Sequence, residues 1–364
     1  MALWTYSFLR DKGEPAMKAA LLTGYTQDFE IGVVPDPTVT GPTDVIVKVG
    51  AAGFCRTDIH LWLGQFAAMH EQAGISLPFV CGHESAGWIV EIGVGVTHVK
   101  VGDAVLLHPL ATCGYCPACR AGDDMHCTAQ VFPGVAAPGG FAEYVKTNAR
   151  AVVPIPEGLT PVDVAPLGDA GLTAYRAVKK ALPLALPGSY TVVLGAGGLG
   201  HIGIQALRAL SQTEIIVVDR NPQALEHARG WGADQTVLAL PDRSHVAEVR
   251  ELTRGVGANV VLDYVGEGGA ETDAVELLGP NGMDVIVGYG GRLEADILSQ
   301  VLSPEATFVG STVGTYTELV ELVALVRRGV VKLTTTTFPL EGINDALRAL
   351  EQGRMIGRGV LVPG

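Results

Sequence analysis

Basic side chains are scarce in this sequence. Lysine and arginine together number 25, against 38 aspartates and glutamates, which gives a formal net charge of −13. A surface this acidic repels the phosphates of nucleic acids and of anionic lipids. We therefore expect no nucleic-acid partner and no membrane partner, and an anionic cofactor would need local hydrogen-bond donors.

Uninterrupted apolar segments are also lacking. Residues 190–210 are nearly long and apolar enough to cross a bilayer, but clustered glycines and His201, Gln205 and Arg208 interrupt them. A strand, a glycine turn and a helix explain every interruption, so we do not expect a membrane span.

The first residues contain no sustained apolar core of the kind that a secretory signal requires. The segment MKAALLTG, which starts at Met17, is typical of an opening strand. We expect residues 1–16 to be an extension ahead of it.

Cysteines are few for the length of the chain, six in 364 residues. This number does not suggest a disulfide scaffold, so we expect a cytoplasmic protein. Four of them follow the spacing C-x2-C-x2-C-x7-C, and four thiolates at this spacing can surround one tetrahedral zinc with no open position. The bacterial ferredoxin pattern closes after three residues and continues with proline, unlike this loop. We predict a structural zinc, with unliganded buried thiols as the alternative, at Cys113, Cys116, Cys119 and Cys127.

The rest of the composition describes a globular chain of more than one domain. Hydrophobic residues make up 48% and charged residues 17% of the 364 residues, which is compatible with large buried cores and not with disorder. Short Val/Ile-rich runs separated by glycine-containing turns predict a mostly β domain in the first half, at residues 44–53, 87–96 and 103–109.

From about residue 170 the pattern changes to strands that alternate with helices. Such alternation predicts an α/β domain with a doubly wound parallel sheet and right-handed crossovers. The expected strands are 191–194, 214–219, 258–265, 283–290 and 307–311. The segment 358–363 returns to the β style of the first half. We expect one domain from residues 1–170 and 313–364, and a second domain, residues 171–312, inserted between them.

A glycine-rich turn follows the first strand of the second domain. Gly195, Gly197 and Gly200 form G-x-G-x-x-G, with Gly198 and Leu199 inside the motif. Its glycines permit a tight turn, a close approach of backbone to a pyrophosphate, and close packing of strand and helix. The motif predicts a dinucleotide site, and a glycine-rich turn without a ligand is the alternative.

Asp219 ends the next strand, where a carboxylate can bind the hydroxyls of the adenosine ribose. The same carboxylate would repel a 2′-phosphate, so NAD is favoured over NADP. Arg220 follows at once and could weaken this preference.

Two further motifs carry residues that can bind metals. Cys55 lies in G-F-C-R-T-D-I-H, and His83 lies in C-G-H-E. Taken singly, a cysteine is usually a small buried residue and a histidine a hydrogen-bonded structural group. Cys81 matches no ligand position, and we expect it to be buried.

Together these motifs, with P-L-G-D-A-G-L-T-A-Y-R-A at 166–177, resemble the zinc-containing medium-chain alcohol dehydrogenases, in order and from Met17 onward. The likeness is strongest to bacterial enzymes that act on secondary or aryl alcohols. The resemblance implies a GroES-like catalytic domain and a Rossmann domain that binds NAD. It also implies two zinc ions per chain, one catalytic and one structural, and a homodimer or homotetramer associated through the cofactor domains.

The resemblance also assigns ligands to the catalytic zinc. Cys55 and His83 match two of them, and Asp169 stands where many relatives have a cysteine. A carboxylate is an acceptable zinc ligand, although Asp169 could instead cap the helix that starts near Gly171. Glu84 resembles the acid behind the zinc, and the carboxylate that orients the histidine corresponds to Asp58.

Other matched positions serve the substrate and the cofactor. Zinc makes a bound alcohol more acidic, and hydride passes from carbon to C4 of the nicotinamide. Thr57 matches the hydroxyl that touches the substrate oxygen, and the alternative is a turn hydroxyl. His60 matches the outer base of a proton relay through the cofactor ribose, and the alternative is a surface histidine. Arg56 and Arg358 resemble arginines that contact the pyrophosphate, or are solvated surface charges.

The substrate pocket is harder to predict. Phe54, Trp62 and the loop of residues 64–78 are candidate apolar walls, with the protein core as an alternative place for Trp62. An apolar alcohol is therefore the first expectation, and a polyol or sugar alcohol the second. A zinc-free quinone or enoyl reductase would not need the metal-binding motifs. A zinc-stabilised sensor of NAD would not need Cys55, Thr57, His60, His83 and Asp169 together.

Overall fold

The chain forms two compact units. The computed structural model describes residues 16–364, so the expected extension lies almost entirely outside the described residues. The first unit runs to Ala170 and includes Thr315–Arg327 and Leu333–Gly364. The second consists of Gly171–Gly314 and Arg328–Lys332. The domain limits expected from the sequence, residues 1–170 with 313–364 and residues 171–312, stay a prediction.

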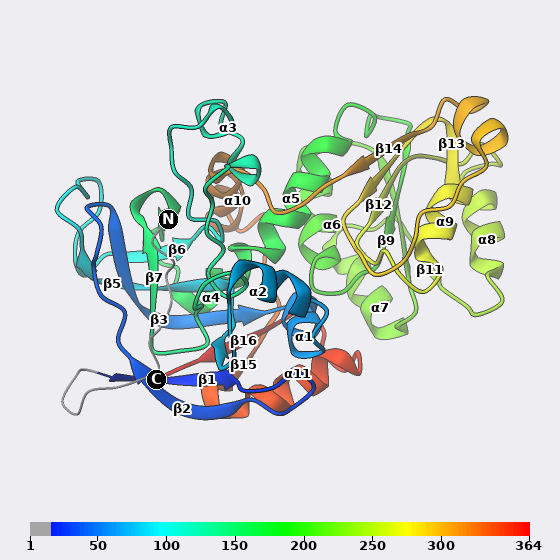
Figure 1. The fold of residues 1–364 in the computed structure, drawn as a ribbon. Helices are drawn as coiled ribbons and strands as arrows, with labels where there is room; N and C mark the ends of the chain where they lie inside the picture. Colours follow the sequence, from blue (N-terminus) through cyan, green and yellow to red (C-terminus); the bar gives the residue numbers. More distant parts are fainter. Residues whose placement is uncertain (1–15) are drawn as a thin grey trace. The chain divides into compact units, whose positions relative to one another are not determined.

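The first unit is mostly β (Figure 1). A seven-stranded sheet has the order β15-β16-β3-β5-β6-β8, with β7 paired to β3, and a three-stranded sheet has the order β2-β1-β4. The strands are β1 (Ala16–Leu22), β2 (Glu30–Pro35), β3 (Asp44–Phe54), β4 (Phe79–Val80), β5 (Glu84–Ile92), β6 (Ala104–Leu107), β7 (Tyr144–Asn148), β8 (Val152–Pro154), β15 (Thr335–Pro339) and β16 (Arg358–Val362).

Helices of one to three turns connect these strands. They are α1 (Arg56–Trp62), α2 (Ala67–Ala73), α3 (Pro117–Arg120), α4 (Pro161–Val164), α10 (Tyr316–Arg327) and α11 (Ile343–Glu351), with single turns η1 (Asp124–His126), η2 (Ala149–Ala151), η3 (Ala165–Leu167) and η5 (Leu340–Gly342). The last strand, β16, pairs antiparallel with β3, so the C-terminal segment completes the first sheet.

The second unit contains a six-stranded parallel sheet of order β11-β10-β9-β12-β13-β14. Its strands are β9 (Tyr190–Leu194), β10 (Glu214–Asp219), β11 (Gln235–Leu238), β12 (Ala258–Asp263), β13 (Leu278–Ile286) and β14 (Thr307–Gly310). Its helices are α5 (Ala170–Ala181), α6 (Gly200–Leu210), α7 (Pro222–Trp231), α8 (Ser244–Leu252) and α9 (Ala270–Leu277), with a π-helical turn η4 (Ile297–Leu302). The predicted fold class, a mostly β GroES-like domain and a Rossmann sheet, is confirmed.

The central strands of this sheet, β9, β10 and β12, are mostly apolar and buried because helices cover both faces of the sheet. Residues from β9, β10 and β12 share one core cluster with Val249 of α8 and Leu277 of α9. The strand expected at 283–290 instead spans Leu278–Ile286. Its pairing with β12 begins at Leu278, ahead of a register irregularity, and β13 ends where the N–H groups of Val287 and Gly288 both donate to the carbonyl of Asp263 at 2.9 Å. Within residues 16–364, no helix combines the length and apolarity needed to cross a membrane.

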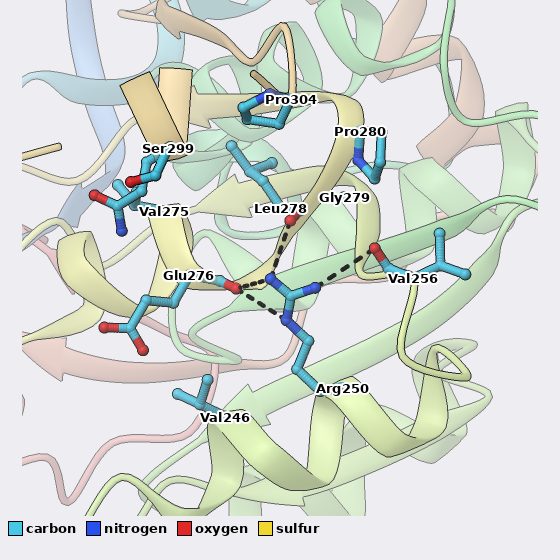
Figure 2. A pocket seen from close by; sticks show the side chains of 11 residues that line it. Val246, Arg250, Val256, Val275, Glu276, Leu278, Gly279, Pro280, Ser299 and Pro304 are labelled. Atoms are coloured by element: carbon cyan, nitrogen blue, oxygen red, sulfur yellow. Dashed lines mark hydrogen bonds between the residues drawn. The ribbon is translucent and has the colours of Figure 1, made fainter. Parts of the chain in front are cut away.

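A cavity of about 440 Å³ opens in the second unit beside Arg250 (Figure 2). The guanidinium donates to the carbonyls of Glu276 and Leu278 and, at 3.5 Å, to that of Val256. These residues lie next to the amino ends of β12 and β13, whereas ligands of doubly wound sheets bind at the carboxyl ends. The contacts of Arg250 therefore tie α8 to the start of β13 and do not form the dinucleotide site.

Candidate active site and metal centres

Strand pairing brings the two metal-binding motifs of the first half together. Cys55 directly follows β3, His83 directly precedes β5, and the two strands pair antiparallel with Gly53 opposite Glu84. The Sγ atom of Cys55 lies 3.2 Å from Nε2 of His83. The same nitrogen lies 3.5 Å from Oδ2 of Asp169, which precedes α5. One donor atom from each of Cys55, His83, Glu84 and Asp169 lies within 4.8 Å of the others.

These donors fit a tetrahedral zinc ion. Zinc–ligand bonds of about 2.0 to 2.3 Å place neighbouring ligand atoms roughly 3.3 to 3.8 Å apart, close to the distances within this cluster. Burial by itself lowers the pKa of His83, but the carboxylate of Asp58, the electrostatic interaction with Cys55 and a hydrogen bond with Asp169 raise it well above its usual value. The cluster thus concentrates negative charge in a buried place, which a dication would neutralise.

Local structure around Cys55 fixes its side chain. Cys55 is the N-cap of α1, and its sulfur accepts the backbone N–H of Thr57 at 3.2 Å. Asp58 completes a capping box, since its Oδ2 accepts the backbone N–H of Cys55 at 2.9 Å. Its other oxygen lies 3.5 Å from Nδ1 of His83. The carboxylate therefore lies between the cap and the histidine, in the place expected for an orienting group.

Glu84, itself one of the four clustered donors, forms a buried ion pair with Arg358. One guanidinium nitrogen of Arg358 lies 2.6 Å from both carboxylate oxygens of Glu84, one of which also accepts the N–H of Ala170 at 3.1 Å. Burial raises the pKa of Glu84, and the Arg358 charge opposes that rise. A Cβ atom at Gly53 would lie 2.1 Å from Oε2 of Glu84, so only glycine leaves room here. The alternative of Arg358 as a solvated surface charge is wrong, because the residue is 3% exposed.

The residues predicted for the proton relay, with Arg56, lie on α1. Thr57 is half-buried and Arg56 is exposed. His60 is buried, which corrects the surface alternative for this residue. The structure adds Phe132, whose ring meets that of His83 edge-on with centroids 5.7 Å apart. No sequence signal marked Phe132, because its relation to His83 arises only when distant segments pack.

The four-cysteine loop also converges on one point. The Sγ atoms of Cys113 and Cys119 are 3.9 Å apart, near the roughly 3.8 Å edge of a zinc–thiolate tetrahedron. Backbone N–H groups of Cys116 and Cys119 point at the preceding ligand sulfurs, at 3.4 Å in each case. Hydrogen bonds from the backbone of Cys119 and Thr128 lower the pKa of Cys116 to about 6, while burial raises that of Cys119 to about 12. A metal ion would remove this imbalance by stabilising every thiolate.

The glycine turn in the second unit leaves space for a ligand. A Cβ atom at Gly200 would lie 1.9 Å from the carbonyl oxygen of Gly195, so packing requires this glycine. At Gly197 an added Cβ would meet no protein atom within 4 Å. The open side of the turn thus matches the place where the motif predicts a pyrophosphate.

Asp219 lies beside this turn. Its Oδ2 accepts the N–H of Ala196 at 2.6 Å and its Oδ1 accepts that of Asn221 at 2.7 Å. These bonds hold both oxygens of the carboxylate beside the glycine turn, while Arg220 is exposed.

Comparisons with known proteins agree with this geometry. The family model "Alcohol dehydrogenase GroES-like domain" matches residues 41–157, and "Zinc-binding dehydrogenase" matches residues 198–328. An NAD-dependent alcohol dehydrogenase of Sulfurisphaera tokodaii is 35% identical over 95% of this chain and 100% of its own length. D-arabinose 1-dehydrogenase (NADP⁺) of Saccharolobus solfataricus is 34% identical over 95% of this chain and 97% of its own.

A solved structure extends this likeness to the fold. The alcohol dehydrogenase of Aeropyrum pernix superimposes with a TM-score of 0.91 at 44% identity, covering 95% of this chain and 100% of that one. The four-cysteine cluster fits a structural zinc, and the cluster of cysteine, histidine and two carboxylates fits a catalytic zinc. With both halves matched and both metal clusters assembled, this chain belongs to the zinc-dependent medium-chain alcohol dehydrogenases.

Proposed function

We propose that this chain interconverts apolar secondary or aryl alcohols and their ketones or aldehydes, with NAD as the hydride carrier. The observation that carries the proposal is the convergence of Cys55, His83 and Asp169 on one point beside the ring of Phe132. The metal donors would hold the zinc that activates the alcohol, and the ring of Phe132 would offer an apolar surface to the substrate.

The proposed mechanism gives each residue a separate task. Cys55, His83 and Asp169 would hold the zinc, which supplies a Lewis acid that makes an alcohol more acidic. Thr57, on the first turn of α1, would accept the hydrogen bond of the substrate hydroxyl. His60, on the same helix, would take up the proton that leaves through the cofactor ribose, as an imidazole can near neutral pH.

Other residues support these groups. Asp58 would hold the histidine ring in its orientation. The ion pair of Glu84 and Arg358 would hold the carboxylate of Glu84 beside the zinc ligands. The pyrophosphate contacts of Arg56 and Arg358 stay a prediction.

We further propose that NAD is preferred over NADP. The carboxylate of Asp219 is hydrogen-bonded to both neighbouring backbone segments, so it cannot swing away without losing two bonds. A 2′-phosphate would meet this negative charge, whereas ribose hydroxyls would donate to it.

The decisive test follows NADH absorbance with the purified protein, NAD⁺ and a panel of small secondary, aryl, primary and polyol alcohols. Parallel reactions use NADP⁺, and zinc per chain is counted by atomic emission. We expect oxidation of apolar secondary or aryl alcohols, two zinc ions per chain and a preference for NAD⁺. Two zinc ions with turnover of polyols alone would contradict the substrate class. One zinc ion and no turnover would favour a sensor of NAD.

Asp169 provides a sharper prediction. Asp169→Ala removes a proposed ligand, so we expect the zinc count to fall from two to one per chain and kcat to fall by at least roughly a hundredfold. Glu157→Ala, an exposed carboxylate of the same unit, is the matched control and should keep both metals. An Asp169→Ala protein that retains two zinc ions would show that Asp169 is not a zinc ligand.

A polyol or sugar substrate is the second candidate. The relative from Saccharolobus solfataricus that is named a D-arabinose 1-dehydrogenase supports it. The panel separates the two candidates because a hydrated polyol gains little from an apolar wall such as Phe132.

We also propose a homodimer or homotetramer, associated through the second unit, in a cytoplasmic protein. The proposed assembly is supported by the surface of η4 beside the edge strand β14. There Ile297, Leu298 and Leu302 are 72%, 65% and 65% exposed. Such a patch favours burial against another chain. Leu298→Asp should shift the mass measured by light scattering toward the monomer, with Val94→Asp, 97% exposed in the first unit, as control. An unchanged mass would place the interface elsewhere.

A further inference from the structure

A buried histidine outside the metal clusters joins three segments of the first unit. His70 lies in α2 and is 1% exposed. Its Nε2 lies 2.8 Å from the carbonyl oxygen of Val135, and its Nδ1 lies 3.3 Å from the hydroxyl of Tyr25. The ring also packs against Phe79, with centroids 5.1 Å apart. Each ring nitrogen therefore has a protein partner.

These partners define the role of each nitrogen. A carbonyl oxygen can only accept a hydrogen bond, so Nε2 must carry the hydrogen that bonds Val135. In the neutral ring Nδ1 then accepts from the hydroxyl of Tyr25. An aliphatic side chain of similar size could make neither bond, whereas a glutamine could donate from its nitrogen and accept at its oxygen.

The bond to Val135 leads toward the metal donors. The backbone N–H groups of Val135 and Ala136 both donate to the carbonyl of Phe132, at 3.1 and 2.7 Å, and so form a tight turn. Val135 is 5% exposed within the core of the unit. Phe132, at the start of this turn, presents its ring edge-on to His83. Anchoring Val135 therefore also anchors the aromatic ring beside the metal cluster.

The bond to Tyr25 leads to the helix that carries Thr57 and His60. The turn after Tyr25 is fastened to the end of α1, because Thr26 donates to the carbonyl of Trp62 at 2.7 Å and the Trp62 indole donates to Gln27 at 2.6 Å. His70 thus connects the segment around α1 with the turn of Phe132.

We propose that His70 is a positioning residue that fixes the Phe132–Val135 turn and thereby the apolar wall beside the catalytic metal. The inference deepens the proposed alcohol dehydrogenation and rests on it. Loosening the turn changes the wall without removing a metal donor. The larger substituent of a bulky alcohol would contact the wall and that of a small alcohol would not, so the effect should depend on substrate size.

The first readout needs no substrate. In the zinc-loaded full chain, amide hydrogen exchange is followed by mass spectrometry over residues 131–137 for His70→Leu, His70→Gln and Tyr25→Phe. We expect exchange about tenfold faster in His70→Leu, the size of one lost buried hydrogen bond. His70→Gln and Tyr25→Phe, which keep the donor to Val135, should stay near the parent. Unchanged exchange in His70→Leu overturns the positioning role.

The second readout compares kcat/KM for 1-phenylethanol and 2-propanol. We expect the ratio of the two values to fall about tenfold in His70→Leu, mainly through KM, and to recover in His70→Gln, with two zinc ions retained. An equal loss for both alcohols, or loss of a zinc ion, overturns the role at the wall. If the parent oxidises neither alcohol, the proposed substrate class is contradicted, and the exchange data still decide whether His70 holds the turn.

Discussion

At the scale of single residues, burial changes what a charge can do. Arg358 and Glu84 form an ion pair in which the side chains are 3% and 0% exposed. From the sequence, Arg358 was matched only to a pyrophosphate contact or a surface charge. Its partner lies 274 positions away along the chain, and no local pattern could identify that partner.

The pair supports a prediction about stability. Arg358→Met leaves a buried carboxylate without its counter-charge, which should cost about 3 to 5 kcal/mol of unfolding free energy. Adding Glu84→Gln removes the orphaned charge, so the double variant should recover much of the loss. Chemical denaturation of zinc-loaded protein measures all of the variants. A double variant no more stable than Arg358→Met would mean that the arginine contributes by packing and not by charge.

At the scale of elements, the glycine turn between β9 and α6 combines two kinds of glycine. Gly200 is required by the protein itself, because a Cβ there would strike the carbonyl of Gly195. Gly197 faces open space and is required only if a ligand approaches. The motif alone does not make this distinction, and the neighbouring backbone does.

Gly197→Val should therefore weaken cofactor binding strongly without harming the fold. We expect the dissociation constant for NADH, measured by fluorescence titration, to rise at least roughly a hundredfold because the side chain fills the place of the pyrophosphate. Zinc content and melting temperature should stay the same. Gly230→Val, at another position where an added Cβ meets no protein atom, serves as control. Undiminished NADH binding by Gly197→Val would place the dinucleotide elsewhere.

At the scale of the whole molecule, the core of the second unit contains a carboxylic acid whose ionised form is disfavoured by burial. Asp284 of β13 pairs in register with Val261 and Phe308 and is 1% exposed. Burial, and then the charge of Asp263, raise the pKa of Asp284 to about 7. Because the pKa of Asp284 is higher in the folded chain than the value of about 3.9 in the unfolded chain, only the unfolded chain ionises readily between these two values. The free energy of unfolding is therefore highest below pH 4 and falls as the pH rises to 7.

Asp284→Asn should remove this pH dependence. We expect the variant to gain over the parent by up to about 3 kcal/mol between pH 5 and pH 7, and this gain to level off about one pH unit above the folded pKa. Thermal unfolding across this pH range measures the difference. Asp345→Asn, an 89% exposed carboxylate, should show no such trend. A constant difference between Asp284→Asn and the parent would mean that Asp284 is ionised throughout.

The sequence by itself determined the features that depend on local order and spacing. Alternating strands and helices predicted the parallel sheet, because a crossover between parallel strands needs a helix. The four-cysteine spacing predicted one closed metal site, because the ligands lie within one loop. The catalytic set was different, since Cys55, His83 and Asp169 were recognisable only through resemblance, and strand pairing brings Cys55 and His83 together.

Only the tertiary structure decided the surroundings of these groups. The ring of Phe132 on His83, the pairing of Arg358 with Glu84, and the two bonds of His70 all join segments far apart in the chain. Burial leaves an apolar pattern within each segment, but that pattern does not show which distant segments meet. Local spacing therefore predicted which chemistry this chain carries, while packing decided which residues orient the metal donors and which residues lie around them.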